Sequence, residues 1–117
     1  MAAWPAQDFT VPTHPLLDLS DALERATDAY MVALDEEAEA ENAYLREFHV
    51  AYAVVCGQGI AVTARKHEAE NVAQVVEARC VWNLAVARVK SARAKCSELE
   101  ARLTAHQSYF RLVGAQT

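Results

Sequence analysis

The fold is decided by a stretch of about fifty residues without glycine or proline, Thr63–Phe110, which reads TARKHEAENVAQVVEARCVWNLAVARVKSARAKCSELEARLTAHQSYF. Its apolar side chains recur mostly at alternating steps of three and four residues, the spacing of one stripe along an α-helix. Such a helix is about 70 Å long at 1.5 Å per residue. In a chain of 117 residues it must lie against a second long helix or another copy of itself. The members of the stripe are Val72, Val75, Trp82, Val86, Val89, Cys96, Leu99, Leu103, His106 and Phe110.

A first helix is predicted upstream, over about residues 19–56. Asp18 or Ser20 can cap its N-terminus with a side-chain oxygen. At the other end, Gly57 and Gly59 suit a C-terminal cap and turn, where positive φ angles are required. The sequence therefore predicts an all-α fold, a long antiparallel two-helix hairpin that resembles a coiled coil.

The predicted domain organisation is one helical hairpin preceded by an arm. The hairpin covers residues 18–117, with a turn at 57–62 and a second helix over about 64–111. Residues 1–17 contain all three prolines of the chain, a spacing that excludes a regular helix. We expect an extended arm whose apolar residues dock either on this chain or on another protomer.

The register of the hairpin follows from the position of its turn. If the chain reverses near residue 60, Trp82 faces Ala38, so that the largest side chain fills the space left by a small one. In this register Val75 faces Leu45. The predicted core of the hairpin consists of Leu34, Leu45, Phe48, Val75, Trp82 and Val86.

The same register leaves the second helix longer than its partner beyond about residue 101. Two helices alone form one thin seam, which stabilises a chain of this size poorly. We therefore expect a homo-oligomer or a protein partner. The residues predicted to make these contacts are Trp4, Phe9, Leu103, His106, Tyr109 and Phe110.

Composition narrows the class of protein. Hydrophobic residues make up 53% of the chain, but 24 of them are alanine, which favours helices and buries little area. The sequence contains neither a long apolar run nor a secretion signal, so we expect no membrane association and a location in the cytoplasm, or within a virion if the protein is phage-encoded. Three widely spaced cysteines are expected to be free thiols.

Enzymatic motifs are missing from the sequence. We find no phosphate-binding glycine loop, nucleophile elbow or metal-binding histidine pair, and we predict no enzyme activity, no cofactor and no metal. His49 and His67 lie on either side of the turn and could approach each other closely enough to share a metal. An ordinary pair of partly exposed histidines is the preferred interpretation.

The charge is unevenly distributed. Residues 18–47 carry ten acids and two bases, whereas residues 63–113 carry nine bases and five acids. A basic run in the second helix could contact a phosphate backbone, with Trp82, Tyr109 or Phe110 stacking on unpaired bases. Alternatively, these charges solvate the helix and pair with acids of the first helix such as Glu24, Asp28 and Asp35. The candidate nucleic-acid contacts are Arg88, Lys90, Arg93 and Lys95.

The order of features is similar to that of small helical accessory proteins of tailed phages. A first helix with Tyr44, Phe48 and Tyr52 precedes a glycine turn, then a basic helix over 83–103 and the segment 108–111, which reads SYFR. Within that class the chain resembles the UvsY-like recombination mediators. The resemblance implies an oligomer that binds single-stranded DNA and helps to load a recombinase, with the four basic residues of the run as the DNA contacts.

Two functions are therefore considered. The first is a non-enzymatic oligomeric interaction or assembly protein, encoded by a phage. The alternative is a mediator that binds single-stranded DNA. Binding of a labelled oligonucleotide at two salt concentrations would discriminate between them, because only phosphate contacts give a steep salt dependence.

Overall fold

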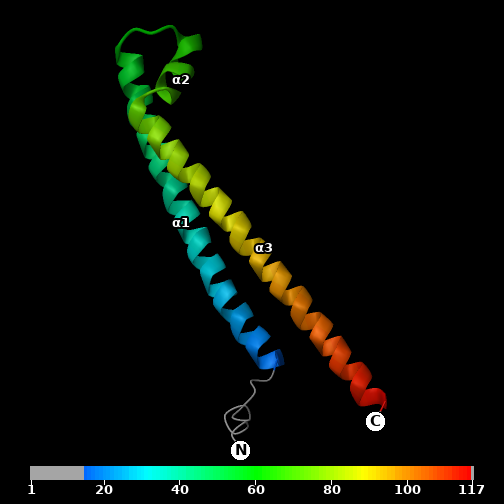
Figure 1. Cartoon of the computed structure of the whole chain (residues 1–117). Helices are drawn as coiled ribbons and strands as arrows, with labels where there is room; N and C mark the ends of the chain where they lie inside the picture. Colours follow the sequence, from blue (N-terminus) through cyan, green and yellow to red (C-terminus); the bar gives the residue numbers. More distant parts are fainter. Residues whose placement is uncertain (1–14, 117) are drawn as a thin grey trace, which may run out of the picture. The chain divides into compact units, whose positions relative to one another are not determined.

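The computed structural model describes residues 15–116, and these residues form helices joined by short connections (Figure 1). Helix α1 covers Pro15–Gly57, α2 covers Val62–Glu70 and α3 covers Ala73–Gln116. No strand occurs in this part of the chain. The all-α class and the pairing of two long helices in a hairpin are confirmed.

The helices contribute to two compact units. The turn unit consists of residues 29–93, and so contains the second part of α1, all of α2 and the first part of α3. The terminal unit contains residues 15–28 and 94–116 of the described chain.

In the turn unit, side-chain contacts define an antiparallel pair of helices. Tyr44 of α1 packs on Trp82 of α3, with ring centroids 5.3 Å apart. Further from the turn, Glu36 approaches Arg88 and Tyr30 approaches Arg93. The predicted contact of Trp82 with Ala38 is wrong, because α3 pairs with α1 in a different register from the predicted one. The chain uses residues 58–72 to cross from α1 to α3, so the reversal comes later than residue 60.

Helix α1 begins at Pro15, earlier than the predicted start near residue 19. Proline is favoured in the first turn because it lacks an N–H that would have no helical partner, and its fixed φ angle suits a helix. Leu16 and Leu17 therefore belong to α1 and not to an extended arm. The rest of the predicted arm, including Trp4 and Phe9, lies outside the described residues.

The end of α1 agrees with the predicted glycine turn. The Gln58 amide donates a hydrogen bond to the Val55 carbonyl at 3.1 Å, and the Gly59 amide donates to the Cys56 carbonyl at 3.4 Å. Gly59 has a φ of 74°, in the left-handed region that favours glycine. This backbone conformation turns the chain towards α2.

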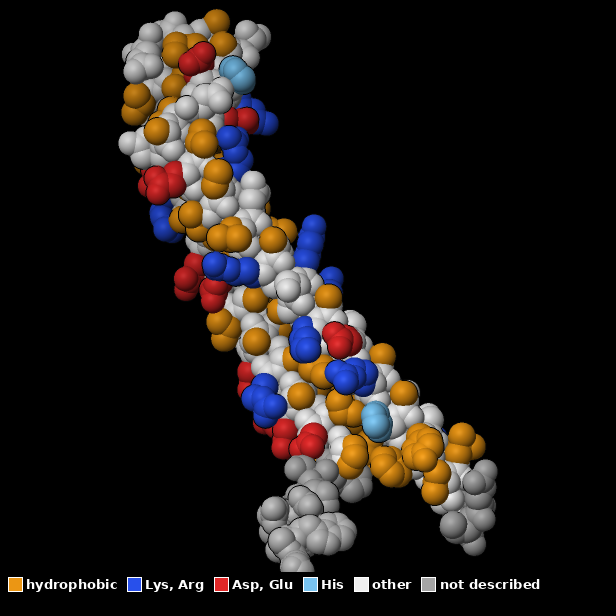
Figure 2. All heavy atoms as spheres, viewed as in Figure 1, with side chains coloured by type: hydrophobic (Ala, Val, Ile, Leu, Met, Phe, Trp, Pro, Cys, Tyr) orange, Lys and Arg blue, Asp and Glu red, His pale blue; other side chains and the backbone are white. Residues whose placement is uncertain are grey.

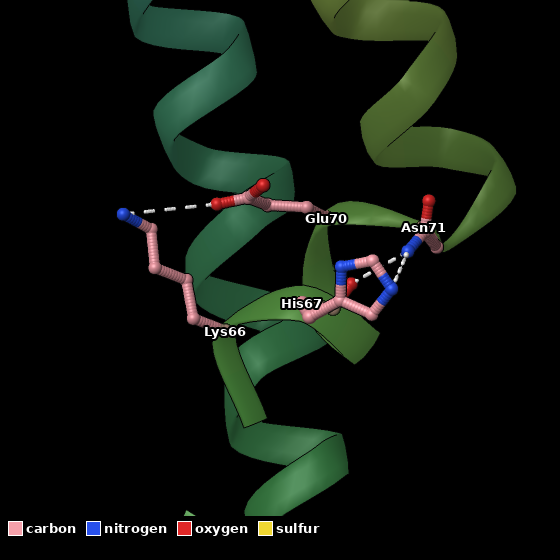
Figure 3. Close-up of polar contacts among 4 residues, drawn as sticks. All are labelled: Lys66, His67, Glu70 and Asn71. Atoms are coloured by element: carbon pink, nitrogen blue, oxygen red, sulfur yellow. Dashed lines mark hydrogen bonds and ion pairs between the residues drawn. The ribbon is translucent and has the colours of Figure 1, made fainter. Parts of the chain in front are cut away.

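The predicted single second helix is wrong, because it is interrupted at Asn71 and Val72 (Figure 3). The Asn71 side-chain amide donates a hydrogen bond to the His67 carbonyl at 2.9 Å and lies 3.2 Å from Nε2 of the His67 ring. Asparagine often ends a helix in this way, because its side chain competes for backbone hydrogen bonds. One residue earlier on each side, Lys66 Nζ lies 3.8 Å from a carboxylate oxygen of Glu70.

The core of the turn unit lies where α2 meets the two long helices. Ala69 and Val75 have no exposed surface, and they cluster with Ala51 and Val55. Half-buried side chains pack around this cluster and extend the apolar contact between the helices: Tyr44, Phe48, Tyr52, Ile60 and Val72.

The predicted core is only partly correct. Val75 is fully buried, and Leu34, Phe48, Trp82 and Val86 are half-buried. Leu45, however, is exposed. On α1 the most deeply buried positions are alanines and one valine, because small side chains at the seam let the two backbones approach closely. These buried residues of α1 are Ala33, Ala40, Ala51 and Val55.

In the terminal unit, α3 buries Cys96 and Leu99. Leu16, Leu19 and Leu23 of α1 are half-buried in the same unit, at the helical spacing of three and four residues. Because α1 begins at Pro15, it continues further along α3 than predicted. Pro15 lies beside Ala105 and His106 and lines a hollow with them.

Candidate interaction surfaces

The predicted basic run makes specific contacts within the turn unit. Arg88 Nη1 lies 3.6 Å from a carboxylate oxygen of Glu36, and both side chains are about half exposed. The Arg93 guanidinium donates hydrogen bonds of 3.0 and 3.3 Å to the Tyr30 hydroxyl. The pair of Arg88 with Glu36 confirms the prediction that bases of the run pair with acids of the first helix, although Glu36 is not one of the three acids named for it, Glu24, Asp28 and Asp35. Arg93 instead contacts Tyr30.

Contact with Tyr30 also affects the pKa of Arg93. The hydrogen bond to the Tyr30 hydroxyl, followed by the electrostatic effect of that group, raises the pKa of Arg93 above its ordinary value. The guanidinium carbon lies 5.8 Å from the centre of the Tyr30 ring, within the range of a cation–π contact. Arg93 is therefore a positive charge that is held against α1.

The four basic residues do not form one continuous stripe. At 100° per residue, Lys90 and Arg93 lie on a side of α3 well away from Arg88. Lys95 belongs to the terminal unit, whereas the other three belong to the turn unit. Lys90 and Lys95 are exposed. The basic run is therefore split between two faces of α3 and does not form one continuous track for a phosphate backbone.

A groove runs along α1 and α3 in the turn unit. Three hollows of ≈ 480, 290 and 260 Å³ share lining residues and form one continuous depression. Ala40, Ala43 and Val81 line the first and second hollows, and Glu47 and Gln74 line the second and third. Val50 and Val54 continue the wall of α1 towards the turn, with exposed fractions of 63% and 54%.

The C-terminal part of α3 carries the second apolar surface, in the terminal unit. The rings of His106 and Phe110 are tilted by 33° with centroids 6.5 Å apart, and the Tyr109 ring meets that of Phe110 edge-on at 5.7 Å. Tyr109 and Leu112 are more than 60% exposed. Figure 2 shows hydrophobic side chains gathered beside a histidine near this end of the chain. Of the predicted contact residues, Leu103 is half-buried and the others in this unit are exposed.

The two histidines near the turn make separate contacts. His67 lies against Asn71, and the His49 ring meets Phe48 at 6.0 Å between ring centroids. Among residues 15–116, no group of three or more histidines, cysteines or acids is arranged to hold a metal ion.

Known proteins supply no further guidance. No family model, curated protein or solved structure matches the chain. Within the described residues, none of the helices is both long and apolar enough to cross a membrane.

Sequence reasoning missed the groove of the turn unit. The signal is present: Val50 and Val54 are four residues apart, and Val81 and Leu84 are three apart, spacings that place each pair on one side of its helix. Both pairs lie outside the main stripes, so they define a second apolar side of the hairpin.

Proposed function

We propose that the protein is a non-enzymatic oligomeric interaction and assembly protein. The supporting observation is the balance of buried and exposed apolar side chains. Among the described residues, the buried core holds only four side chains larger than alanine or cysteine, namely Val55, Val75, Val89 and Leu99. Thirteen large hydrophobic side chains are exposed. Exposed apolar residues that gather on one surface mark sites of association.

The shape and lining of the hollows also support this proposal. They are open depressions along helices, and eight of their fifteen lining residues are alanine or valine. A small polar substrate is usually held in an enclosed site with several convergent polar groups. An alanine-lined groove is better suited to the apolar side of another helix. Because the order of features resembles that of small helical accessory proteins of tailed phages, we also propose that the protein is encoded by a phage.

A second candidate function is the binding of single-stranded DNA. The observation in its favour is that residues 78–97 of α3 contain five bases and no acid. Contacts with phosphates would release counterions and make the affinity strongly dependent on salt. Arg88 and Arg93 would have to exchange their contacts with Glu36 and Tyr30 for phosphates, which weakens this candidate relative to the first.

Two measurements on the full chain test the proposed function directly. Light scattering over a range of concentrations should show an oligomer, and fluorescence anisotropy should show no binding to a labelled single-stranded oligonucleotide at about 50 mM salt. A chain that stays monomeric at every concentration would overturn the proposal.

Oligonucleotide binding would instead support the second candidate under one condition. The double variant Arg88→Glu/Arg93→Glu should lower the slope of the logarithm of the binding constant against the logarithm of the salt concentration by about two. The matched control is Lys66→Glu/Arg102→Glu. It reverses two exposed charges that form similar surface ion pairs, with Glu70 and Glu98. The control should leave the slope unchanged if binding is localised to the basic run.

A further inference from the structure

We infer that a second copy of this chain occupies the groove of the turn unit, in a two-fold arrangement that places both turns at the same end. This inference rests on the proposed function and names its partner and surface. Two turn units would then form an antiparallel bundle of four long helix segments, in which α1 of each copy lies against α3 of the other.

The groove has the surface that such packing needs. Its floor contains Ala40, Ala43 and Ala78, and its wall contains Val50, Val54 and Val81. Small residues at the floor allow another helix to come close, and the exposed valines supply apolar area to bury. Leu84, which is 53% exposed, lies one helical turn beyond Val81 and extends the apolar side of α3.

Charge complementarity identifies the occupant. Residues 29–57 of α1 carry six acids and one base, a net charge of −5. Residues 73–93 of α3 carry one acid and four bases, a net charge of +3. Within the groove itself the charged residues include Arg46 on α1 and Glu77 on α3, so a copy of the chain in the reversed order can place each arginine beside the glutamate of the other copy.

The same charges select one of two symmetric arrangements. A two-fold axis along the helices places α1 opposite α3 of the other copy, so that every neighbouring pair joins an acidic and a basic helix. A two-fold axis across the helices places α1 opposite α1, which brings like charges together. The first arrangement is favoured because juxtaposed like charges are costly at an interface.

Residues at the rim of the groove support this choice. Glu36 and Arg88 lie at the same height along the bundle, because they approach each other within one chain. In the favoured arrangement, Glu36 of one copy therefore comes to the height of Arg88 of the other. Arg46 and Glu77 also line the groove, one on each helix, and they form a second complementary pair between copies.

Other occupants fit this groove less well. Glu36, Glu39, Glu47 and Glu77 line the hollows together with the single base Arg46. This excess of carboxylates repels a nucleic-acid backbone, which has no positive groups, whereas a second copy brings Arg46 and Arg88 as partners for two of the carboxylates. Binding of DNA in the groove would accordingly contradict the inference and is an outcome of the test.

The first experiment places a charge in the groove of the full chain. Val81→Glu should weaken self-association by at least tenfold in sedimentation velocity, and Val81→Ala should weaken it by a smaller factor. The matched control is Val62→Glu on α2, a valine that is 70% exposed and does not line the groove. Val62→Glu should change the dissociation constant of self-association by less than twofold. Circular dichroism checks that each variant keeps its helix content.

The second experiment distinguishes the two arrangements by the distance between spin labels at Gln58→Cys, in a background of Cys56→Ser, Cys80→Ser and Cys96→Ala. Gln58 lies at the turn, about 20 Å along the helix from the middle of the groove. With both turns at the same end, the labels lie within about 30 Å of each other, whereas opposite ends separate them by more than about 40 Å. The longer distance would overturn the inferred arrangement.

The outcomes separate the inference from the proposed function. An oligomer that is unaffected by Val81→Glu would overturn the groove as its interface and leave the proposed function standing. Loss of association in both Val81→Glu and Val62→Glu would also overturn the groove, because the effect would not be specific to it. A monomeric wild-type chain would overturn both. If labelled DNA binds the wild-type chain and Val81→Glu weakens that binding, nucleic acid occupies the groove. This result would overturn the inference.

Discussion

The indole ring of Trp82 packs on the phenol ring of Tyr44, with an interplanar angle of 32°. Tyr44 continues into a ladder on α1, since it stacks on Phe48 at 6.2 Å and Phe48 stacks on Tyr52 at 5.9 Å. This series links the middle of the hairpin to the cluster around Val75 near the turn. In a seam made largely of alanine, these rings supply much of the apolar contact between the helices of the turn unit.

Replacing Trp82 with alanine should remove the largest side chain at this seam. Because Trp82 is half-buried, we expect a loss of about 3 kcal/mol in the free energy of unfolding, at the lower end of the range for large aromatic residues. Urea unfolding followed by circular dichroism at a fixed protein concentration measures it. Trp82→Phe keeps a ring on Tyr44 and should cost less, and an equal cost for both variants would contradict a role for ring packing.

Val75→Ala tests the fully buried position of the core. Loss of two methyl groups and the cavity left behind should lower the free energy of unfolding by about 2 kcal/mol. Val62→Ala makes the same chemical change at a residue that is 70% exposed, and it should stay within about 0.5 kcal/mol of wild type. Thermal unfolding of the two variants under the same conditions makes the comparison. Similar melting temperatures for both would place Val75 outside the core.

The two glycines of the turn should respond in opposite directions to alanine. Gly59 has a φ of 74°, so Gly59→Ala should destabilise the protein by about 1–2 kcal/mol. Gly57 ends α1 without a positive φ, and a Cβ there would meet nothing within 4 Å. Gly57→Ala should therefore be neutral or stabilise by up to about 1 kcal/mol, because alanine favours a helix. Chemical unfolding of both variants gives the sign of the change in the free energy of unfolding. A stabilising effect of Gly59→Ala would contradict the observed turn.

The break between α2 and α3 should depend on the side chain of Asn71. Asn71→Ala removes the hydrogen bond to the His67 carbonyl, and we expect a cost of about 0.5–1.5 kcal/mol. His67→Ala keeps that carbonyl and removes only the ring, so it is the matched control and should cost less. Amide hydrogen exchange at residues 66–72 reports the local effect. Unchanged exchange in Asn71→Ala would show that the backbone alone sets the break.

Much of the fold could be predicted from local sequence. The absence of glycine and proline between Thr63 and Phe110 indicated a long helix, and its apolar stripe correctly located Val75, Val89, Cys96 and Leu99 in the buried set. The glycine turn was also predictable, because a positive φ has a strong residue preference. Asn71 escaped prediction, since a single asparagine interrupts a helix only when its side chain finds a backbone acceptor.

The surfaces were less predictable than the helices. The basic run was visible in the sequence, but the pairing of Arg88 with Glu36 and of Arg93 with Tyr30 joins residues on different helices. Their contacts depend on the register, which shifted once residues 58–72 were used to cross between α1 and α3. The expected core residue Leu45 became exposed for a related reason, because α1 presents its alanines to the seam.

The sequence by itself determined that most of the chain is helical and that α1 ends at the glycines, because propensity and periodicity act between residues close together in the chain. Only the tertiary structure decided which side of each helix faces its neighbour. That choice depends on packing between distant residues, where Ala40 fits a close helix contact and Tyr44 needs the space beside Trp82. The groove of Val50, Val54 and Val81 exists because this packing leaves a second apolar side uncovered.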